Sequence, residues 1–260
     1  MKYKMNGGNM QLREIKPLTD TGLVKAVYST IDNSSWHCNE EKDYDNYKEY
    51  AQELGLDAGR MIRIPQTHSS KVRVVSDCHA GEGIIRPVSV EGYDGMVTNV
   101  SKLILTTVEA DCVPVYMLDP VKKVIAMVHS GWRGTAGLIT VDAINTMVKE
   151  YGSSCEDILV CLGPCICGKC YEVGGEIRED FLKNYSYLET ERFFIKRESL
   201  EDNKFSLDIP RAIKISVINA GIRECNFYDA PCCTYESLDL CSWRRDKDVS
   251  LRMLTGIMLV

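Results

Sequence analysis

Short runs of apolar and β-branched residues, bounded by glycine, proline or aspartate, recur through the first half of the chain. Runs of this length and composition predict strands rather than helices. They lie at 23–30, 61–64, 71–75, 95–98, 103–108, 113–118 and 124–129. Because little helix separates the last six of these runs, we expect their strands to pair in an antiparallel or mixed manner.

A helical period dominates elsewhere. Apolar and aromatic positions at helical spacing predict helices at 41–54, 138–151, 176–185 and 209–221, with further strands at 158–163, 204–208 and 252–260. The first dozen residues are expected to be a loose lead-in. The sequence shows no internal repeat, low-complexity tract or linker. The predicted fold class is α/β: a single domain over residues 1–260, with mixed β-sheets and packed helices.

Composition narrows the classes of function. A chain of 260 residues with 45% hydrophobic content can bury a substantial core. With a formal charge of −6 and interspersed acidic and basic residues, the chain has no positive electrostatic field that would attract nucleic acid or anionic lipid. No apolar segment approaches the roughly 18 to 20 residues of a membrane span, and the N-terminus lacks a signal-peptide core, so we expect a cytoplasmic protein. The twelve cysteines are then expected to be thiols, a few of them ligands or nucleophiles.

Three residues of ligand type end or follow predicted strands: His68, Cys112 and His129. Separations of 44 and 17 positions exclude a finger-like structural zinc site, whose ligands come in close pairs. Strands can nevertheless bring distant positions together. Two imidazoles and one thiolate suit Zn²⁺ and leave one tetrahedral position open for water or substrate, as in catalytic zinc sites.

Other interpretations of these three residues remain open. A single histidine is usually a satisfied core or surface residue, and a single cysteine usually a small buried apolar one. Cys112 could instead be a thiolate nucleophile activated by His129 or His68, as in a metal-free cysteine hydrolase. A metal-binding or partner-binding module without catalysis is also compatible with the sequence.

Candidate substrate contacts surround these positions. The segment GWRGT after His129 leads toward the helix expected near Ala136, so its amides could form an anion-binding nest with Arg133. Arg244 and Arg245 are further candidates for an anion, although salt bridging would also explain at least one of them.

The segment CGKC, Cys167–Cys170, has redox-motif spacing, and together with Cys165 it could hold a metal. A thioredoxin-like site requires such a pair at a helix N-terminus. Two glycines follow closely in YEVGGE, so we interpret the segment as a structural loop.

Six motifs occur in an order that resembles the polyphenol oxidase or laccase-domain family, also called the YfiH family. They are QTH at Gln66–His68, YDGMVTN at Tyr93–Asn99, ADCVP at Ala110–Pro114, HSGWRGT at His129–Thr135, GPCICGKCYEVG at Gly163–Gly174 and CTYESLDLCSWRRD at Cys233–Asp246. The resemblance runs from about Leu23 to the C-terminus. It implies an α/β fold of the kind shared with bacterial cytotoxic necrotising factor.

The resemblance also implies a function. Members of this family have been reassigned as purine nucleoside phosphorylases with adenosine deaminase activity. Their zinc ligands fall on His68, Cys112 and His129, and the pocket takes a purine nucleoside such as adenosine, inosine or methylthioadenosine, with phosphate or water as the second reactant. Gln66 is then expected to contact substrate with the arginines named above. Asp111 is either a proton shuttle or a residue that supports the site.

The older family name implies a copper-dependent phenol oxidase as an alternative. A multicopper centre needs more imidazoles than the four histidines of this chain provide, so zinc is the expected metal and copper the less expected one.

Overall fold

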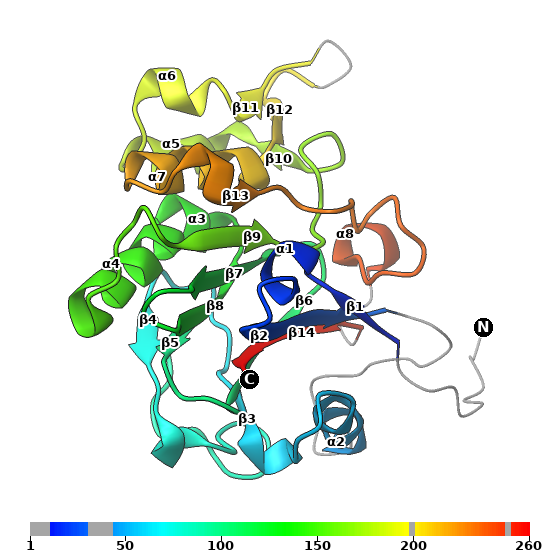
Figure 1. The fold of residues 1–260 in the computed structure, drawn as a ribbon. Coiled ribbons are helices and arrows are strands. Elements are labelled where there is room, and N and C mark those ends of the chain that lie inside the picture. The colour runs from blue at the N-terminus through cyan, green and yellow to red at the C-terminus, as the bar shows by residue number, and fades with distance from the viewer. Residues whose placement is uncertain (1–10, 31–43, 198–200, 248–250) are drawn as a thin grey trace.

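The fold is a computed structural model that describes residues 11–30, 44–197, 201–247 and 251–260 (Figure 1). Its strands are β1 Leu12–Glu14, β2 Val24–Ser29, β3 Met61–Arg63, β4 Val72–Val74, β5 Gly95–Thr98, β6 Ile104–Glu109, β7 Val113–Asp119, β8 Val124–Ser130, β9 Leu159–Leu162, β10 Glu172–Gly174, β11 Phe194–Ile195, β12 Lys204–Leu207, β13 Phe227–Tyr228 and β14 Met253–Leu259. Its α-helices are α1 Lys16–Thr19, α2 Tyr44–Glu53, α3 Trp132–Ala136, α4 Ile139–Tyr151, α5 Arg178–Leu182, α6 Tyr187–Thr190, α7 Ile209–Asn219 and α8 Trp243–Asp246.

The strands form two large mixed sheets and one small antiparallel sheet. One large sheet has the order β1-β2-β14-β6-β3, and the other has the order β13-β9-β7-β8-β5-β4. Each contains a parallel pair at an edge, such as β3 with β6 and β4 with β5, among antiparallel pairs. The small sheet has the order β10-β12-β11 and lies at the top of Figure 1 with α5, α6 and α7.

Strand alternation explains why the two large sheets pack face to face. Along β8, Val124, Ala126 and Val128 belong to one apolar core, whereas Ile125 and Met127 belong to another. Successive strand side chains point to opposite faces, so a strand that is apolar at every position must be covered on both sides. The second core also contains inward residues of the five-stranded sheet, which therefore covers one face of the six-stranded sheet.

Helices cover the outer faces of both sheets. The helix α4 runs along the other face of the six-stranded sheet, with α3 and α7 beside it (Figure 1). The helix α2 packs Tyr47 and Tyr50 against the outer face of the five-stranded sheet, where Val27 and Met61 complete a third core. The layers are therefore helix, sheet, sheet and helices, which confirms the predicted α/β class with mixed sheets and packed helices.

Most predicted elements are present, and three differ. The predicted loose lead-in ends in β1, which begins at Leu12. Residues 1–10 of the lead-in and residues 41–43 of the predicted helix at 41–54 lie outside the described residues. The GWRGT segment is itself the helix α3, which starts at Trp132 rather than near Ala136, and Leu138 separates it from α4 with a φ of 60°. The predicted helix at 176–185 is shorter, because Gly175–Ile177 forms a 3₁₀ turn before α5.

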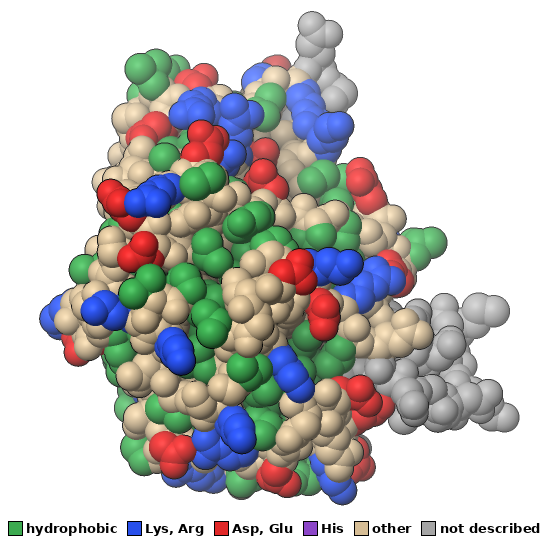
Figure 2. All heavy atoms as spheres, viewed as in Figure 1, with side chains coloured by type: hydrophobic (Ala, Val, Ile, Leu, Met, Phe, Trp, Pro, Cys, Tyr) green, Lys and Arg blue, Asp and Glu red, His purple; other side chains and the backbone are tan. Residues whose placement is uncertain are grey.

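Charge is mixed on the face of the molecule in Figure 2, where acidic and basic side chains are interspersed over the described surface. Among the described residues, no helix combines the length and the apolar character that a membrane crossing demands.

Candidate active site

His68, Cys112 and His129 meet at one edge of the six-stranded sheet. The antiparallel register of β7 and β8 pairs Val113 with Ser130, so the start of β7 and the end of β8 share that edge. Cys112 immediately precedes β7, and His129 lies near the end of β8. His68 comes from the loop between β3 and β4, where it has a φ of 60°. The three ligand atoms lie within 4.8 Å of one another.

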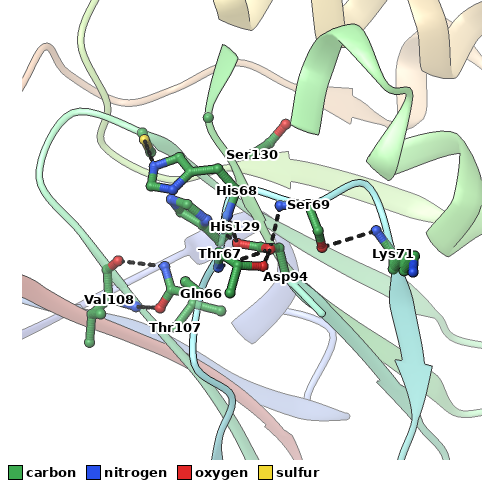
Figure 3. Close-up of polar contacts among 12 residues, drawn as sticks. Gln66, Thr67, His68, Ser69, Lys71, Asp94, Thr107, Val108, His129 and Ser130 are labelled. Carbon is green, nitrogen blue, oxygen red and sulfur yellow. Dashed lines mark hydrogen bonds and ion pairs between the residues drawn. The ribbon is translucent and has the colours of Figure 1, made fainter. Parts of the chain in front are cut away.

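The buried carboxylate of Asp94 fixes both histidines (Figure 3). Its Oδ1 lies 2.8 Å from Nδ1 of His129 and accepts the backbone N–H of His68 at 3.0 Å. Its Oδ2 accepts the backbone N–H groups of Thr67 and Ser69. A carboxylate on one imidazole nitrogen sets the tautomer and directs the other nitrogen, Nε2, toward a ligand. Asp94 is therefore a positioning residue for both histidines.

The arrangement fits a tetrahedral metal ion. Bonds of about 2.3 Å to sulfur and about 2.0 Å to nitrogen imply a sulfur to nitrogen separation of about 3.5 Å. Cys112 Sγ lies 3.9 Å from Nε2 of His68, close to that value. A Cβ on Gly131 would lie 2.9 Å from the His68 ring and 3.1 Å from the sulfur, so only glycine leaves room for both donors. Two nitrogens and one thiolate are a donor set that zinc accepts.

The thiol and the imidazole stabilise each other in their charged forms. Burial raises the pKa of Cys112, but the His129 charge and hydrogen bonds from both histidines outweigh it and lower that pKa to about 6. Burial lowers the pKa of His129, whereas the Cys112 thiolate and the Asp94 carboxylate raise it to about 10. Without a bound metal the sulfur is therefore a thiolate near neutral pH, paired with a protonated His129, and this is also the form that attacks as a nucleophile. A metal bound here would displace the Nε2 proton of His129 and take the thiolate as its ligand.

A cavity of about 530 Å³ opens over the three residues. Four arginines line it: Arg63, Arg133, Arg244 and Arg252. Its aromatic walls are Trp132, Tyr171 and Trp243. A pocket of this size accommodates a small organic molecule, the arginines favour an anion, and the aromatic rings favour a flat, unsaturated ring.

Of the predicted substrate contacts, Gln66, Arg133 and Arg244 line the cavity, and Arg245 does not. The Gln66 amide pairs with the backbone of Val108 in both directions, with both distances 2.8 Å, so it also fixes the cavity wall. The guanidinium of Arg245 donates to the carbonyls of Thr234, Ser237 and Leu240 and to Asp246. Arg245 therefore holds a loop together in this structure, and its predicted contact with substrate stays a prediction.

Asp111 supports the site through its carboxylate. Its Oδ1 accepts the Thr234 hydroxyl at 2.6 Å, and its Oδ2 accepts the backbone N–H of Arg244 at 2.7 Å. Because both oxygens already accept bonds, of the two roles expected for Asp111 the supporting one fits this geometry. The residue has a φ of 88°, which turns the chain sharply just before Cys112.

Several residues of this site are not among those predicted from the sequence. The sequence context of Asp94 does indicate a role: it directly precedes the apolar run at Gly95–Thr98, and a carboxylate buried there needs hydrogen-bond partners. Arg63 lies at the end of β3, so as a polar residue near the end of a predicted strand it is indicated in the same way as His68. Tyr171 and Arg252 have no such indication, because only the tertiary fold brings their segments to the cavity.

The cysteines of CGKC lie near each other and near a third thiol. Cys167, Cys170 and Cys233 have their sulfurs within 4.8 Å. The partner predicted from the sequence, Cys165, belongs instead to the buried core. No helix begins at CGKC, since the strand β10 follows, so the geometry is not that of a thioredoxin-like site. Burial and the two neighbouring thiols raise the pKa of Cys170, the opposite of what a reactive thiol requires.

Fold and site together define an α/β protein with a candidate metal centre at the edge of a sheet, beneath an arginine-lined cavity. Comparison with known proteins assigns the family: residues 19–260 match the family described as multi-copper polyphenol oxidoreductase laccase, and the chain belongs to it.

Two relatives and one solved structure illustrate its similarities. The chain is 34% identical to a purine nucleoside phosphorylase of Bacteroides thetaiotaomicron over 75% of the chain and 71% of that protein. It is 31% identical to adenosine deaminase RL5 of an unknown prokaryotic organism, over 80% of the chain and 78% of that protein. The crystal structure of the Bacillus licheniformis protein YfiH superposes with a TM-score of 0.86 at 25% identity, covering 99% of this chain and 98% of that one. The predicted resemblance to the YfiH family is thus confirmed.

Proposed function

We propose that this protein is a zinc-dependent purine nucleoside phosphorylase that also deaminates adenosine. The observation that carries the proposal is the convergence of His68, Cys112 and His129 beneath a cavity lined by four arginines. Relatives named purine nucleoside phosphorylase and adenosine deaminase support the class of substrate. Adenosine, inosine and methylthioadenosine are the proposed nucleosides, and inorganic phosphate is the second reactant.

The metal in this proposal is held by Nε2 of His129, Nε2 of His68 and Sγ of Cys112. Bound zinc supplies Lewis acidity to an oxygen of phosphate or water. Asp94 keeps the His129 ring oriented, and Gly131 leaves the space that the donors need.

The arginines bind phosphate. Arg63 and Arg244 line the cavity, and the Nε of each is buried without a hydrogen-bond partner in the protein. A buried donor without a partner is costly, and an anion in the cavity would satisfy it. Arg133 stacks on Trp132, with 4.3 Å between the guanidinium carbon and the ring centroid, and leaves its donors directed to solvent or ligand.

The aromatic side chains hold the purine. Trp132, Tyr171 and Trp243 lie around the cavity, and Arg244 stacks on Tyr171 at 5.2 Å, which fixes that ring in place. A purine between such surfaces buries its apolar faces and leaves its edges for hydrogen bonds.

In phosphorolysis, a phosphate oxygen forms a bond to C1′ of the ribose while the bond from C1′ to N9 of the purine breaks. The base leaves with that electron pair and takes up a proton. The arginines hold the phosphate against the ribose and balance its charge, which converts a bimolecular encounter into a positioned one. In deamination, water replaces phosphate as the attacking group, C6 is attacked, and ammonia leaves.

The donor set also bears on the copper alternative that the family's description raises. The cluster offers two imidazoles and one thiol, whereas a multicopper centre requires many more imidazoles. The remaining described histidine, His79, bonds locally to Ser76 in its own 3₁₀ turn. Zinc therefore remains the proposed metal. The predicted single domain and cytoplasmic location also remain part of this proposal.

Product analysis tests the proposal. The protein is incubated separately with adenosine, inosine and methylthioadenosine, each with and without phosphate, and the products are separated by chromatography. Adenosine and inosine should give free purine and ribose 1-phosphate, and only when phosphate is present. Methylthioadenosine should give free purine and methylthioribose 1-phosphate under the same condition. Inosine should form from adenosine without phosphate. If no nucleoside gives a product under either condition, the proposed function is wrong.

A further inference from the structure

A second group of thiols lies behind the wall of the cavity. Its members come from the turn at Cys167–Cys170 and from Cys233, with sulfurs within 4.8 Å of one another. A carboxylate adjoins them, since Oε1 of Glu236 lies 3.6 Å from Sγ of Cys170. Three sulfurs thus form the group, and an exposed carboxylate lies beside one of them.

The backbone holds these donors in place. Cys170 donates its N–H to the carbonyl of Cys167 at 3.0 Å, which closes the turn and turns both thiols to one side. The two segments pair through a bridge between Cys165 and Cys233, and Thr234 donates its N–H to the Cys165 carbonyl at 3.0 Å. The site therefore does not depend on side-chain placement alone.

A backbone hydrogen bond orients one sulfur of the cluster. The backbone N–H of Cys167 points to Sγ of Cys233 at 3.3 Å. An amide donor at sulfur is the kind of supporting contact found around metal ligands.

We propose that Cys167, Cys170 and Cys233 bind a structural zinc ion. Glu236 supplies the fourth ligand. Zinc to sulfur bonds of about 2.3 Å place sulfurs about 3.8 Å apart in a tetrahedron, so the cluster closes on the ion with a small contraction. A redox pair would need two thiols at most, whereas this cluster has three sulfurs and a carboxylate.

The ion would hold in place two segments that form part of the cavity wall. Ile166 and Tyr171, on either side of the turn, both line the cavity. Thr234, next to Cys233, donates to the Asp111 carboxylate. A zinc ion here thus joins the two segments that carry these contacts, and it stabilises the fold because metal binding and folding are coupled.

Metal counting tests this proposal independently of the proposed function. The full chain is stripped with a chelator under reducing conditions, reloaded with zinc, freed of excess metal and analysed by elemental mass spectrometry. Cys170→Ser should bind one zinc fewer than the wild type, and its Tm should fall by several degrees. The matched control is Cys225→Ser, an exposed thiol outside the cluster, which should bind as much zinc as the wild type. Equal zinc in Cys170→Ser and the wild type would overturn the proposal.

Cobalt substitution separates the two thiol sites and needs no variant in this cluster. Sulfur-to-cobalt absorption grows with the number of thiolates, which is three here and one at Cys112. Cys112→Ser should therefore keep most of the absorption of the wild type, even if the candidate active site binds no metal. If cobalt gives only single-thiolate absorption and Cys112→Ser removes it, or if thiol titration finds a disulfide between Cys167 and Cys170, the second zinc site does not exist.

Discussion

The two sulfur-containing clusters of this protein differ in donors and in surroundings. The group His68, Cys112 and His129 has two nitrogens and one sulfur and faces a cavity. The group around Cys170 has three sulfurs with a carboxylate beside them, and its residues do not line that cavity. Three protein donors leave a metal open to a fourth ligand, whereas four close it. In the proposed sites, donor number and access to the cavity distinguish the reactive metal site from the structural one.

The two clusters are also built differently. Strands β7 and β8 place Cys112 and His129 at one sheet edge, supported by Asp94. The other thiols lie on two irregular segments that are joined by a few backbone hydrogen bonds. Damage to the first should therefore reduce catalysis more than stability, and damage to the second the reverse.

The largest effect is expected at a ligand of the first cluster. His68→Ala should reduce nucleoside turnover to the background of the assay, because the remaining two donors hold metal weakly. His79→Ala is the matched control, since His79 is a histidine that bonds only locally. Steady-state kinetics of both variants measure the difference. Full turnover in His68→Ala would contradict the proposal that this cluster is the reactive site.

Asp94→Asn should lower metal affinity or activity by about 10- to 100-fold, because the His129 ring loses the carboxylate that orients it. Competition with a coloured chelator measures the affinity. Asp142→Asn is the control: Asp142 also accepts a backbone N–H, from Val72, but that residue is not one of the three ligands. Equal losses in both variants would show that Asp94 acts only on the fold.

The stability that Asp94 contributes should depend on pH in a defined direction. Burial raises its pKa, but His129 and Ser69 outweigh burial and lower it from 3.8 to about 2. A lowered carboxyl pKa stabilises the folded state above the unfolded pKa, and this contribution is lost as the pH falls toward 2.

We therefore expect chelator-treated wild type to exceed Asp94→Asn by about 2 kcal/mol in unfolding free energy near pH 5, and the excess to shrink below about pH 4. Urea unfolding followed across this pH range measures it. An excess that does not change with pH would show that the carboxylate charge contributes nothing.

The smallest of these effects is expected at the cavity rim. Arg133→Ala should raise the KM for phosphate about tenfold, the equivalent of one charge-assisted hydrogen bond, and leave phosphate-free deamination nearly unchanged. Arg223→Ala is the control, because Arg223 is exposed and paired with Glu156. A parallel rise in the KM for nucleoside would place Arg133 at the base rather than at phosphate.

The sequence predicts much of this fold because local patterns determine it. The apolar run at 124–129 predicts a strand, and the structure has β8 there, covered on both faces. Long-range pairing lies beyond such patterns. The strand β14 inserts between β2 and β6, so Gly256 pairs with both Val27 and Thr106, and nothing near Gly256 in the sequence indicates either partner.

The site shows the same division. The three ligand-type residues were identified from strand ends and from the family resemblance, and the structure brings them together. Arg244 and Arg245 are identical in type and adjacent, yet one lines the cavity and the other binds loop carbonyls. Only the backbone conformation of α8 decides which side chain goes where. Likewise Cys233 joins CGKC through a tertiary bridge.

Zinc content and turnover of Cys112→Ser, measured together on one preparation, test the central claim most directly. Zinc at the candidate active site and nucleoside turnover should be lost together, because the proposed role of the sulfur is that of a ligand. Loss of turnover with that zinc fully retained would contradict it and would make Cys112 a nucleophile.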